Sequence, residues 1–474
     1  MPTIFFGIAY FCGMAARGGF SSRIGFIAAA AGSAVGLGNI WQFPYVAGQN
    51  GGAAFLLIYV FWIFLIGFPI MLGEITLGRS AQANPYGAYK KYGGKIWGLV
   101  GLFGILCGIM ILSFYNVVSG WAFGYFLETA FGNLLENESH SSFFGDYVAD
   151  FTDNLWFSLG FMAITAVIVL QGVKKGIEGS AKILMPALFA LLIGIIIYGL
   201  TLPGAMEGLK FYLLPDFSLI TGATIYSALG QAFFSLSLGM GGLITYGSYL
   251  SKKENIVSSA TLVAIADTMV AFLAGLMIFP LVFSQGQSPS EGPGLVFVAL
   301  PGIFQAMGPI LGKVVGSSFF LLLCFAALTS TISLLEVAVA YFIDERKWSR
   351  KKAVIVMAFL IFLIGIPSML GYGAIQGLTE FTFYEGSSKS FMDLVQDLFS
   401  VIALPLGGFL LSIFIATRWT TAKFSEEISL GAENYKGSFL EGFLNIMIKF
   451  VCPVVLGFMF MLTVLQKFFN VELF

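Results

Sequence analysis

The chain has 474 residues, of which 58% are hydrophobic and only 10% are charged, and its mean hydropathy is +0.90. Soluble globular proteins carry roughly 25% charged residues, so this composition excludes a soluble enzyme or binding domain and predicts a membrane protein with many spans. The formal net charge of −1 gives no sign of a nucleic-acid partner, and no sequence feature points to an obligatory protein partner.

Hydrophobic runs of about 20 residues, the length that crosses a bilayer as a helix, predict an all-α polytopic membrane protein with about eleven spans. In chain order, the predicted spans are residues 23–47, 52–77, 97–128, 155–172, 180–202, 222–250, 257–284, 313–343, 353–370, 390–417 and 441–467. Residues 1–22 form an N-terminal segment ahead of them. Prolines interrupt residues 286–309, so we expect an external loop there that caps an entrance.

The basic residues predict the orientation of these spans. If residues 1–22 are cytoplasmic, all but four of the 24 Lys and Arg residues fall in cytoplasmic segments. The four exceptions are Lys210, Lys313, Lys389 and Lys467. Because basic residues accumulate in cytoplasmic loops, this distribution predicts a cytoplasmic N-terminus and, with eleven spans, an external C-terminus.

The first span contains an interruption. Its sequence AAAAGSAVGLGNIWQFP, residues 28–44, carries Gly32, Gly36 and Gly38 beside the short polar side chains of Ser33 and Asn39. Each glycine costs roughly 1 kcal/mol in a helix interior, and lipid cannot satisfy a broken backbone. Free carbonyls and amides at two half-helix ends can bind a cation and an anion. The pattern therefore predicts a site for a solute and an ion in the middle of the membrane.

A second interruption occurs in the sixth span, GQAFFSLSLGMGGLITYGSY, residues 230–249. Two broken helices five spans apart indicate two inverted five-helix repeats, residues 23–202 and 203–417, followed by residues 418–474 with the eleventh span. Close packing of helices through small residues is the alternative interpretation of each glycine cluster.

Four ordered motifs carry a family resemblance: RIGFIAAAAGSAVGLGNIWQFPY, GEITLGR, FFSLSLGMG and LTSTIS, which begin at residues 23, 73, 233 and 328. They resemble the neurotransmitter:sodium symporter family, particularly its bacterial amino-acid members of the leucine-transporter type. The resemblance runs from Arg17 to about Phe468. It implies a five-plus-five inverted repeat with broken spans one and six, in the plasma or inner membrane.

The resemblance also implies two sodium sites. The first would be formed by Ala34, Asn39, Ser235 and Asp267 together with the substrate carboxylate. The second would be formed by Gly32, Val35, Ala326, Thr329 and Ser330. Na⁺ prefers oxygen ligands, which these segments supply. Read without the resemblance, the hydroxyls of residues 329–331 can instead bond back to their own helix.

An amino-acid site is implied next to the first sodium site. Its carboxylate would contact the backbone amides of Leu37 and Gly38 and the hydroxyl of Tyr115, since a half-helix N-terminus suits an anion. The amino group would face the carbonyls of Ala34 and Phe234 and the hydroxyl of Ser237, close to Ser235. The side-chain pocket would be lined by Ile111, Phe234, Met240, Ser330 and Leu334. This uncharged lining favours a hydrophobic or aromatic L-amino acid.

Three carboxylates inside the membrane, Glu74, Asp267 and Glu336, need an explanation, because such groups are costly there and usually functional. Animal members bind chloride where Tyr59, Gln231 and Ser235 stand here, and bacterial members commonly carry a carboxylate nearby. Asp267 would supply that charge, so we expect no chloride requirement. Glu74 resembles the family's second-span carboxylate that bonds to the broken sixth helix. Glu336 has no role implied by the resemblance; it can pair locally or take up a proton.

Gate residues are implied at both ends. The family's external ion pair is replaced here by Gln42 and Gln396, although Asp397 is the next residue. At the cytoplasmic end Arg17, Tyr249 and Asp344 match the family's closing network, while Phe20 replaces a tryptophan.

The segment from Gly176 to Pro186 matches relatives whose fifth helix unwinds to release sodium inward. The alternative is a helix that begins near Ser180 and is only kinked by Pro186.

The sequence thus predicts a non-enzymatic symporter that couples inward movement of Na⁺, with two ions expected, to uptake of a hydrophobic or aromatic L-amino acid by alternating access. The alternatives are an amino-acid-binding membrane sensor and a proton-coupled or uncoupled transporter that keep the fold.

Overall fold

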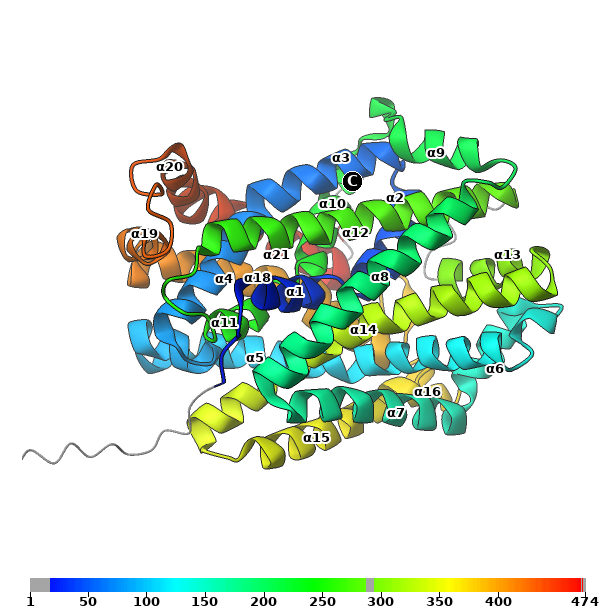
Figure 1. Ribbon diagram of the computed structural model, residues 1–474, viewed down its shortest axis with the longest axis horizontal. Helices are drawn as coiled ribbons and strands as arrows, with labels where there is room; N and C mark the ends of the chain where they lie inside the picture. Colours follow the sequence, from blue (N-terminus) through cyan, green and yellow to red (C-terminus); the bar gives the residue numbers. More distant parts are fainter. Residues whose placement is uncertain (1–17, 287–293, 470, 472–474) are drawn as a thin grey trace, which may run out of the picture.

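The computed structural model describes residues 18–286, 294–469 and 471. Arg17, most of the N-terminal segment and residues 287–293 of the expected cap loop lie outside the described residues. Within the described part, the chain is almost entirely helical, and most long helices run along the longest axis of the molecule (Figure 1).

The first part of the chain contains α1 (Arg23–Ala34), η1 (Gly38–Gln42), α2 (Phe43–Gln49), α3 (Ala53–Trp62), η2 (Ile63–Gly67), α4 (Phe68–Ala81), α5 (Pro85–Ala130), η3 (Leu134–Glu136), α6 (His140–Ala149), α7 (Phe151–Leu170), η4 (Val173–Ile177), α8 (Glu178–Gly199), α9 (Ala205–Leu213) and η5 (Phe217–Leu219). Here η marks a short helix of tighter or wider winding.

The second part contains α10 (Gly222–Ser235), α11 (Gly242–Gly247), α12 (Ile256–Ser284), η6 (Leu295–Ala299), α13 (Leu300–Ala306), α14 (Pro309–Arg346), α15 (Arg350–Leu370), α16 (Gln376–Thr379), β1 (Thr382–Tyr384), β2 (Ser387–Lys389), α17 (Phe391–Gln396), η7 (Asp397–Ile402), α18 (Ala403–Phe414), η8 (Ile415–Trp419), α19 (Thr421–Ser429), α20 (Phe439–Ile446), η9 (Met447–Val451) and α21 (Cys452–Phe469). The two strands pair antiparallel, with Thr382 opposite Lys389.

Nine helical stretches of the described chain are long and apolar enough to cross a membrane. A tenth candidate is the pair formed by residues 23–34 and 38–49, which is bent by 51° at its break. The predicted interruption of the first span is therefore confirmed. The predicted span 222–250 consists of α10 and the short α11, with non-helical residues between them, so the exact number of eleven stays a prediction.

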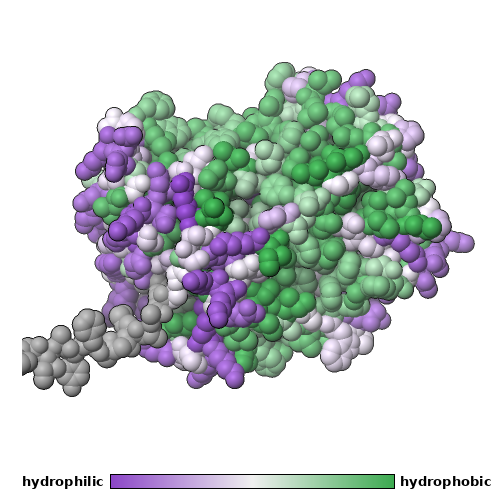
Figure 2. Space-filling view, in the orientation of Figure 1, coloured by the Kyte–Doolittle hydropathy of each residue, from purple (hydrophilic) through white to green (hydrophobic). Residues whose placement is uncertain are grey.

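The surface has the distribution expected of a membrane protein. Hydrophobic residues cover most of the middle, and hydrophilic residues gather toward the two ends of the long axis (Figure 2). One end holds α19 and α20 and the other holds α6 and α13 (Figure 1); we call them the α19 end and the α13 end. The short helices η6 and α13 occupy much of the predicted cap loop.

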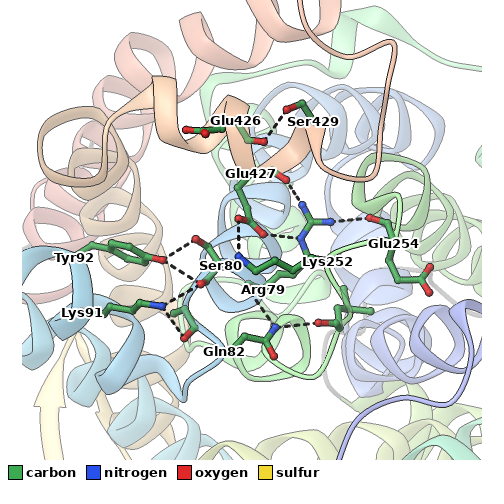
Figure 3. Close-up of polar contacts among 12 residues, drawn as sticks. Arg79, Ser80, Gln82, Lys91, Tyr92, Lys252, Glu254, Glu426, Glu427 and Ser429 are labelled. Atoms are coloured by element: carbon green, nitrogen blue, oxygen red, sulfur yellow. Dashed lines mark hydrogen bonds and ion pairs between the residues drawn. The ribbon is translucent and has the colours of Figure 1, made fainter. Parts of the chain in front are cut away.

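Helix α4 connects the α19 end to the second break. At its middle, Glu74 accepts a hydrogen bond of 2.7 Å from the backbone amide of Gly239, which lies between α10 and α11. Near its end, Arg79 is fully buried and pairs with Glu427 of α19 at 2.9 Å. Arg79 also donates to the carbonyls of Glu427 and, at 2.7 Å, Glu254 (Figure 3). One guanidinium thus joins α4, α19 and the loop after α11.

We expect Arg79→Met to destabilise the protein by about 3 kcal/mol, because it removes the buried partner of the Glu427 carboxylate and leaves it only the half-exposed Lys252 at 3.5 Å. Lys90→Met is the matched control, since Lys90 is 44% exposed and lies 3.9 Å from Glu345; exposed pairs contribute about 0–1 kcal/mol. Thermal unfolding of the purified proteins, followed by circular dichroism, measures both. Equal midpoints for the two variants would contradict the role assigned to Arg79.

Candidate functional site

The two helix breaks lie side by side in the interior. The hydroxyl of Ser237 donates to the carbonyl of Ser33 at 3.1 Å, and the side-chain amide of Gln231 donates to the carbonyl of Gly38 at 2.8 Å. Gly239 requires the absence of a side chain: its φ is +86°, and a Cβ there would overlap the carbonyl of Leu404. Irregular backbone at this depth is thereby satisfied within the protein, as a membrane requires.

A central cavity lies between the breaks. It is lined by Ser33, Ala34, Gly36, Gly38, Ile111, Tyr115, Phe234, Ser237, Met240, Ser330, Ser333, Leu334 and Leu404. Nine of the eleven residues predicted to bind substrate are in this lining. The exceptions are Leu37, whose amide donates to the Tyr115 hydroxyl at 2.8 Å, and Ser235, which lies in the adjoining polar cluster.

That cluster consists of Asn39, Tyr59, Ser235 and Asp267. The Asp267 side chain is fully buried and accepts hydrogen bonds from the Asn39 amide at 2.7 Å, the Ser235 hydroxyl at 2.9 Å and the Tyr59 hydroxyl at 3.3 Å. No Lys, Arg or His in the described chain forms an ion pair with it. A buried carboxylate whose hydrogen-bond donors are all neutral keeps an uncompensated negative charge, which a bound cation would compensate.

A second group of oxygen atoms joins α1 to α14. The Thr329 hydroxyl lies 3.2 Å from the carbonyl of Val35 and 2.9 Å from that of Ala326. The Ser330 hydroxyl lies 3.4 Å from the Val35 carbonyl. Gly32 packs directly on Thr329, since a Cβ built on Gly32 would lie only 3.2 Å from the Cβ of Thr329. Thr329 therefore bonds back to its own helix and also reaches the break in α1.

Comparisons with known proteins identify the family of the chain. The family model described as the sodium:neurotransmitter symporter family matches residues 17–151 and 146–472. The chain belongs to the sodium:neurotransmitter symporter family. It is 40% identical over 445 residues to the sodium-dependent transporter YhdH of Bacillus subtilis, covering 93% of this chain and 96% of that protein. A sodium-dependent transporter of Haemophilus influenzae is 36% identical over 456 residues, 92% of this chain and 96% of that protein.

A solved structure, that of MhsT in complex with L-phenylalanine, superposes with a TM-score of 0.85 at 47% identity. The match covers 94% of this chain and 99% of the MhsT chain. The chain is therefore a sodium-dependent membrane transporter of the leucine-transporter type. The family and the fold expected from the sequence motifs are confirmed.

A second cavity lies next to the central one, on the side of the α13 end. It is lined by Leu37, Trp41, Gln42, Tyr45, Phe114, Tyr115, Val118, Phe234 and Gln396. Tyr115 and Phe234 line both cavities and separate them. Gln42 and Gln396 thus share one chamber of this symporter. Asp397 instead accepts from the Tyr384 hydroxyl at 2.7 Å and pairs with Lys467 at 3.2 Å.

At the α19 end, the structure gives Glu336 a partner that sequence reasoning missed. Arg350 of α15 forms an ion pair with Glu336 at 2.6 Å, and the Tyr249 hydroxyl donates to the same carboxylate at 2.7 Å. Asp344 accepts from the backbone amide of Asn84 at 2.9 Å. The predicted third member of this network, Arg17, lies outside the described residues.

Helix α8 passes close to the second oxygen group. Met185 comes within 3.6 Å of a Cβ built on Gly32. The stretch from Gly176 to Pro186 is helical here: η4 leads into α8, and Pro186 lies inside it. Where η4 leads into α8, the Ser180 hydroxyl donates a hydrogen bond of 2.7 Å to the carbonyl of Gly176.

The contact of Glu74 with the second break can be tested by substitution. We expect Glu74→Leu to lower sodium-dependent uptake of a labelled amino-acid mixture at least tenfold, because the buried amide of Gly239 loses its acceptor, at a cost of about 1–3 kcal/mol. Glu74→Gln keeps a carbonyl acceptor and should retain most of the uptake. An equal loss in both variants would show that the charge of Glu74, and not its acceptor, is required.

Proposed function

We propose that the protein imports a hydrophobic or aromatic L-amino acid together with Na⁺ by alternating access and without chloride. The observation that carries this proposal is the buried Asp267 carboxylate, which has neutral donors only and lies beside the central cavity. A cation that binds there neutralises a charge that would otherwise be costly to bury. Binding of the cation and of the solute in the cavity is thereby coupled.

The cavity matches the two ends of an amino acid. Tyr115 uses its oxygen to accept from the Leu37 amide, so its hydrogen can be donated to a substrate carboxylate near the amides of Leu37 and Gly38. The carbonyls of Ala34 and Phe234 and the hydroxyl of Ser237 would receive the ammonium group. The apolar side chains of Ile111, Phe234, Met240 and Leu334 would surround the substrate side chain. L-phenylalanine bound in MhsT supports this class.

Two sodium ions are proposed. Ala34, Asn39, Ser235 and Asp267 would hold the first with the substrate carboxylate, and Gly32, Val35, Ala326, Thr329 and Ser330 would hold the second. Each Na⁺ gains about 2.3 kcal/mol per 100 mV of membrane potential. Two ions can therefore support an accumulation on the order of a thousandfold, at roughly 1.4 kcal/mol per tenfold ratio.

Alternating access would use the contacts at both ends. We place the α19 end in the cytoplasm, with the C-terminus outside, and assign residues 23–202 and 203–417 to the two inverted repeats. Gln42 and Gln396 would close the external chamber as a neutral amide pair. Tyr249, Asp344 and Arg17 would close the cytoplasmic side. Unwinding between Gly176 and Pro186 would open a release route beside Met185.

Uptake into proteoliposomes tests coupling directly. We expect accumulation of labelled hydrophobic amino acids under an inward Na⁺ gradient but not under an equal K⁺ gradient. Replacement of chloride by gluconate should leave the rate unchanged. Sodium-dependent binding without accumulation would indicate a sensor instead, and uptake indifferent to Na⁺ would overturn the proposed coupling.

Asp267→Asn tests the proposal that the Asp267 carboxylate makes transport independent of chloride. The variant lacks the fixed negative charge beside Tyr59, Gln231 and Ser235, so a chloride ion should be able to replace it. We expect uptake by the variant to be at least tenfold slower than wild type in gluconate and to recover partly in chloride. Equal rates in the two anions for the variant would show that Asp267 does not stand in for chloride.

A further inference from the structure

We propose that the deep end of the central cavity recognises a hydrogen-bond donor on the substrate side chain, so that tyrosine and tryptophan are favoured over side chains of similar size without a donor. The inference rests on the proposed function and specifies the substrate of the same site. Its basis is a pair of serines, Ser33 of α1 and Ser333 of α14, which the sequence motifs contain but do not pair.

Both serines lie on the far side of the cavity from the aromatic partition. They line the central cavity but not the chamber that contains Gln42 and Gln396. Ser333 follows Ser330 by one helical turn toward the α19 end of α14. Each serine is 1% exposed. A substrate whose carboxylate lies near Tyr115 would therefore point its side chain toward the two serines.

We call Ser33, Ser237, Ser330 and Ser333 the serine wall of the cavity. Their hydroxyl hydrogens already form hydrogen bonds within the protein. The Ser33 hydroxyl donates to the Ser333 hydroxyl at 2.8 Å, and Ser333 donates to the carbonyl of Ser330 at 2.9 Å. The hydroxyls of Ser237 and Ser330 point to the Ser33 carbonyl at 3.1 and 3.4 Å. Among the described residues, no group donates to the Ser33 hydroxyl oxygen. The wall therefore offers acceptor lone pairs and no spare donor.

The surroundings of the pair restrict the ligand further. Ile111, Met240, Leu334 and Leu404 form the apolar part of the lining, which suits the face of an aromatic ring. A phenol hydroxyl or an indole N–H combines such a ring with one donor at its edge. A thioether or a plain phenyl ring leaves the Ser33 oxygen without a partner. A site built around a hydrogen bond discriminates against ligands that cannot form it.

The test compares ligands that differ by the donor alone. Equilibrium binding to the purified full-length protein in Na⁺ is measured for tyrosine against phenylalanine and for tryptophan against 3-benzothienylalanine, in which sulfur replaces the indole N–H. One neutral hydrogen bond predicts affinity ratios of about three to tenfold in favour of the donor ligand. Ser33→Ala should reduce both ratios to about one. Ser412→Ala is the matched control, because Ser412 is buried and bonds to its own helix at 2.7 Å; its ratios should equal those of wild type.

Ratios near one in the wild type would overturn the inference, as would a Ser33→Ala variant that weakens all four ligands equally. If Ser33→Ala fails to fold, the two wild-type ratios still decide. Loss of sodium-dependent binding for all four ligands would overturn the proposed function itself, which distinguishes that failure from a failure of the serine pair. An unchanged donor preference in Ser33→Ala would assign the recognition to another group.

Discussion

The structure depends on one constraint: backbone that leaves helical geometry inside a membrane must find its hydrogen-bond partners within the protein. Here the breaks after α1 and α10 supply partners to each other. The Ser33 carbonyl is reached by Ser237, and the Gly38 carbonyl by Gln231. Each break thus obtains part of its hydrogen bonding from the other segment. Their mutual dependence places the cavity, the Asp267 cluster and the Thr329 group within one small volume.

Helix α4 explains how this arrangement is held in the rest of the bundle. Glu74 and Arg79 are little more than one turn apart on the same helix, yet they contact different segments: the backbone of Gly239 and the side chain of Glu427. A rigid helix transmits the position of one contact to the other. The loop that contains Glu254 follows α11, so Glu74 and Arg79 together hold the two ends of the segment that runs from the second break to this loop. The motif GEITLGR is thus a mechanical link between the α19 end and the site.

The sequence was sufficient for the family, the helical fold and the first break, because glycine clusters within apolar runs and long ordered motifs are local signals. The family resemblance also pointed to Gln396, which lines the same chamber as Gln42. Contacts between distant helices were out of reach. Arg350 begins α15 and meets Glu336 only after the turn at Lys347. Ser33 and Ser333 are 300 positions apart, and nothing local in either motif indicates that their hydroxyls meet. No spacing rule within one helix predicts either pair.

Three of the buried carboxylates, Glu74, Asp267 and Glu336, show how the groups around a carboxylate determine what its charge can do. Glu336 is paired with Arg350, so a fixed cation of the protein neutralises its charge. Glu74 accepts a hydrogen bond from the backbone amide of Gly239 and forms no ion pair among the described residues. Its role here is to satisfy the backbone of the second break. Asp267 receives three donors from three different segments, none of them charged. A Lys or Arg side chain beside Asp267 would neutralise the carboxylate and remove any need for a bound cation. Neutral donors orient the carboxylate without cancelling its charge, which is the state that the proposed cation site requires in a low-dielectric interior and that the Glu336–Arg350 ion pair does not offer.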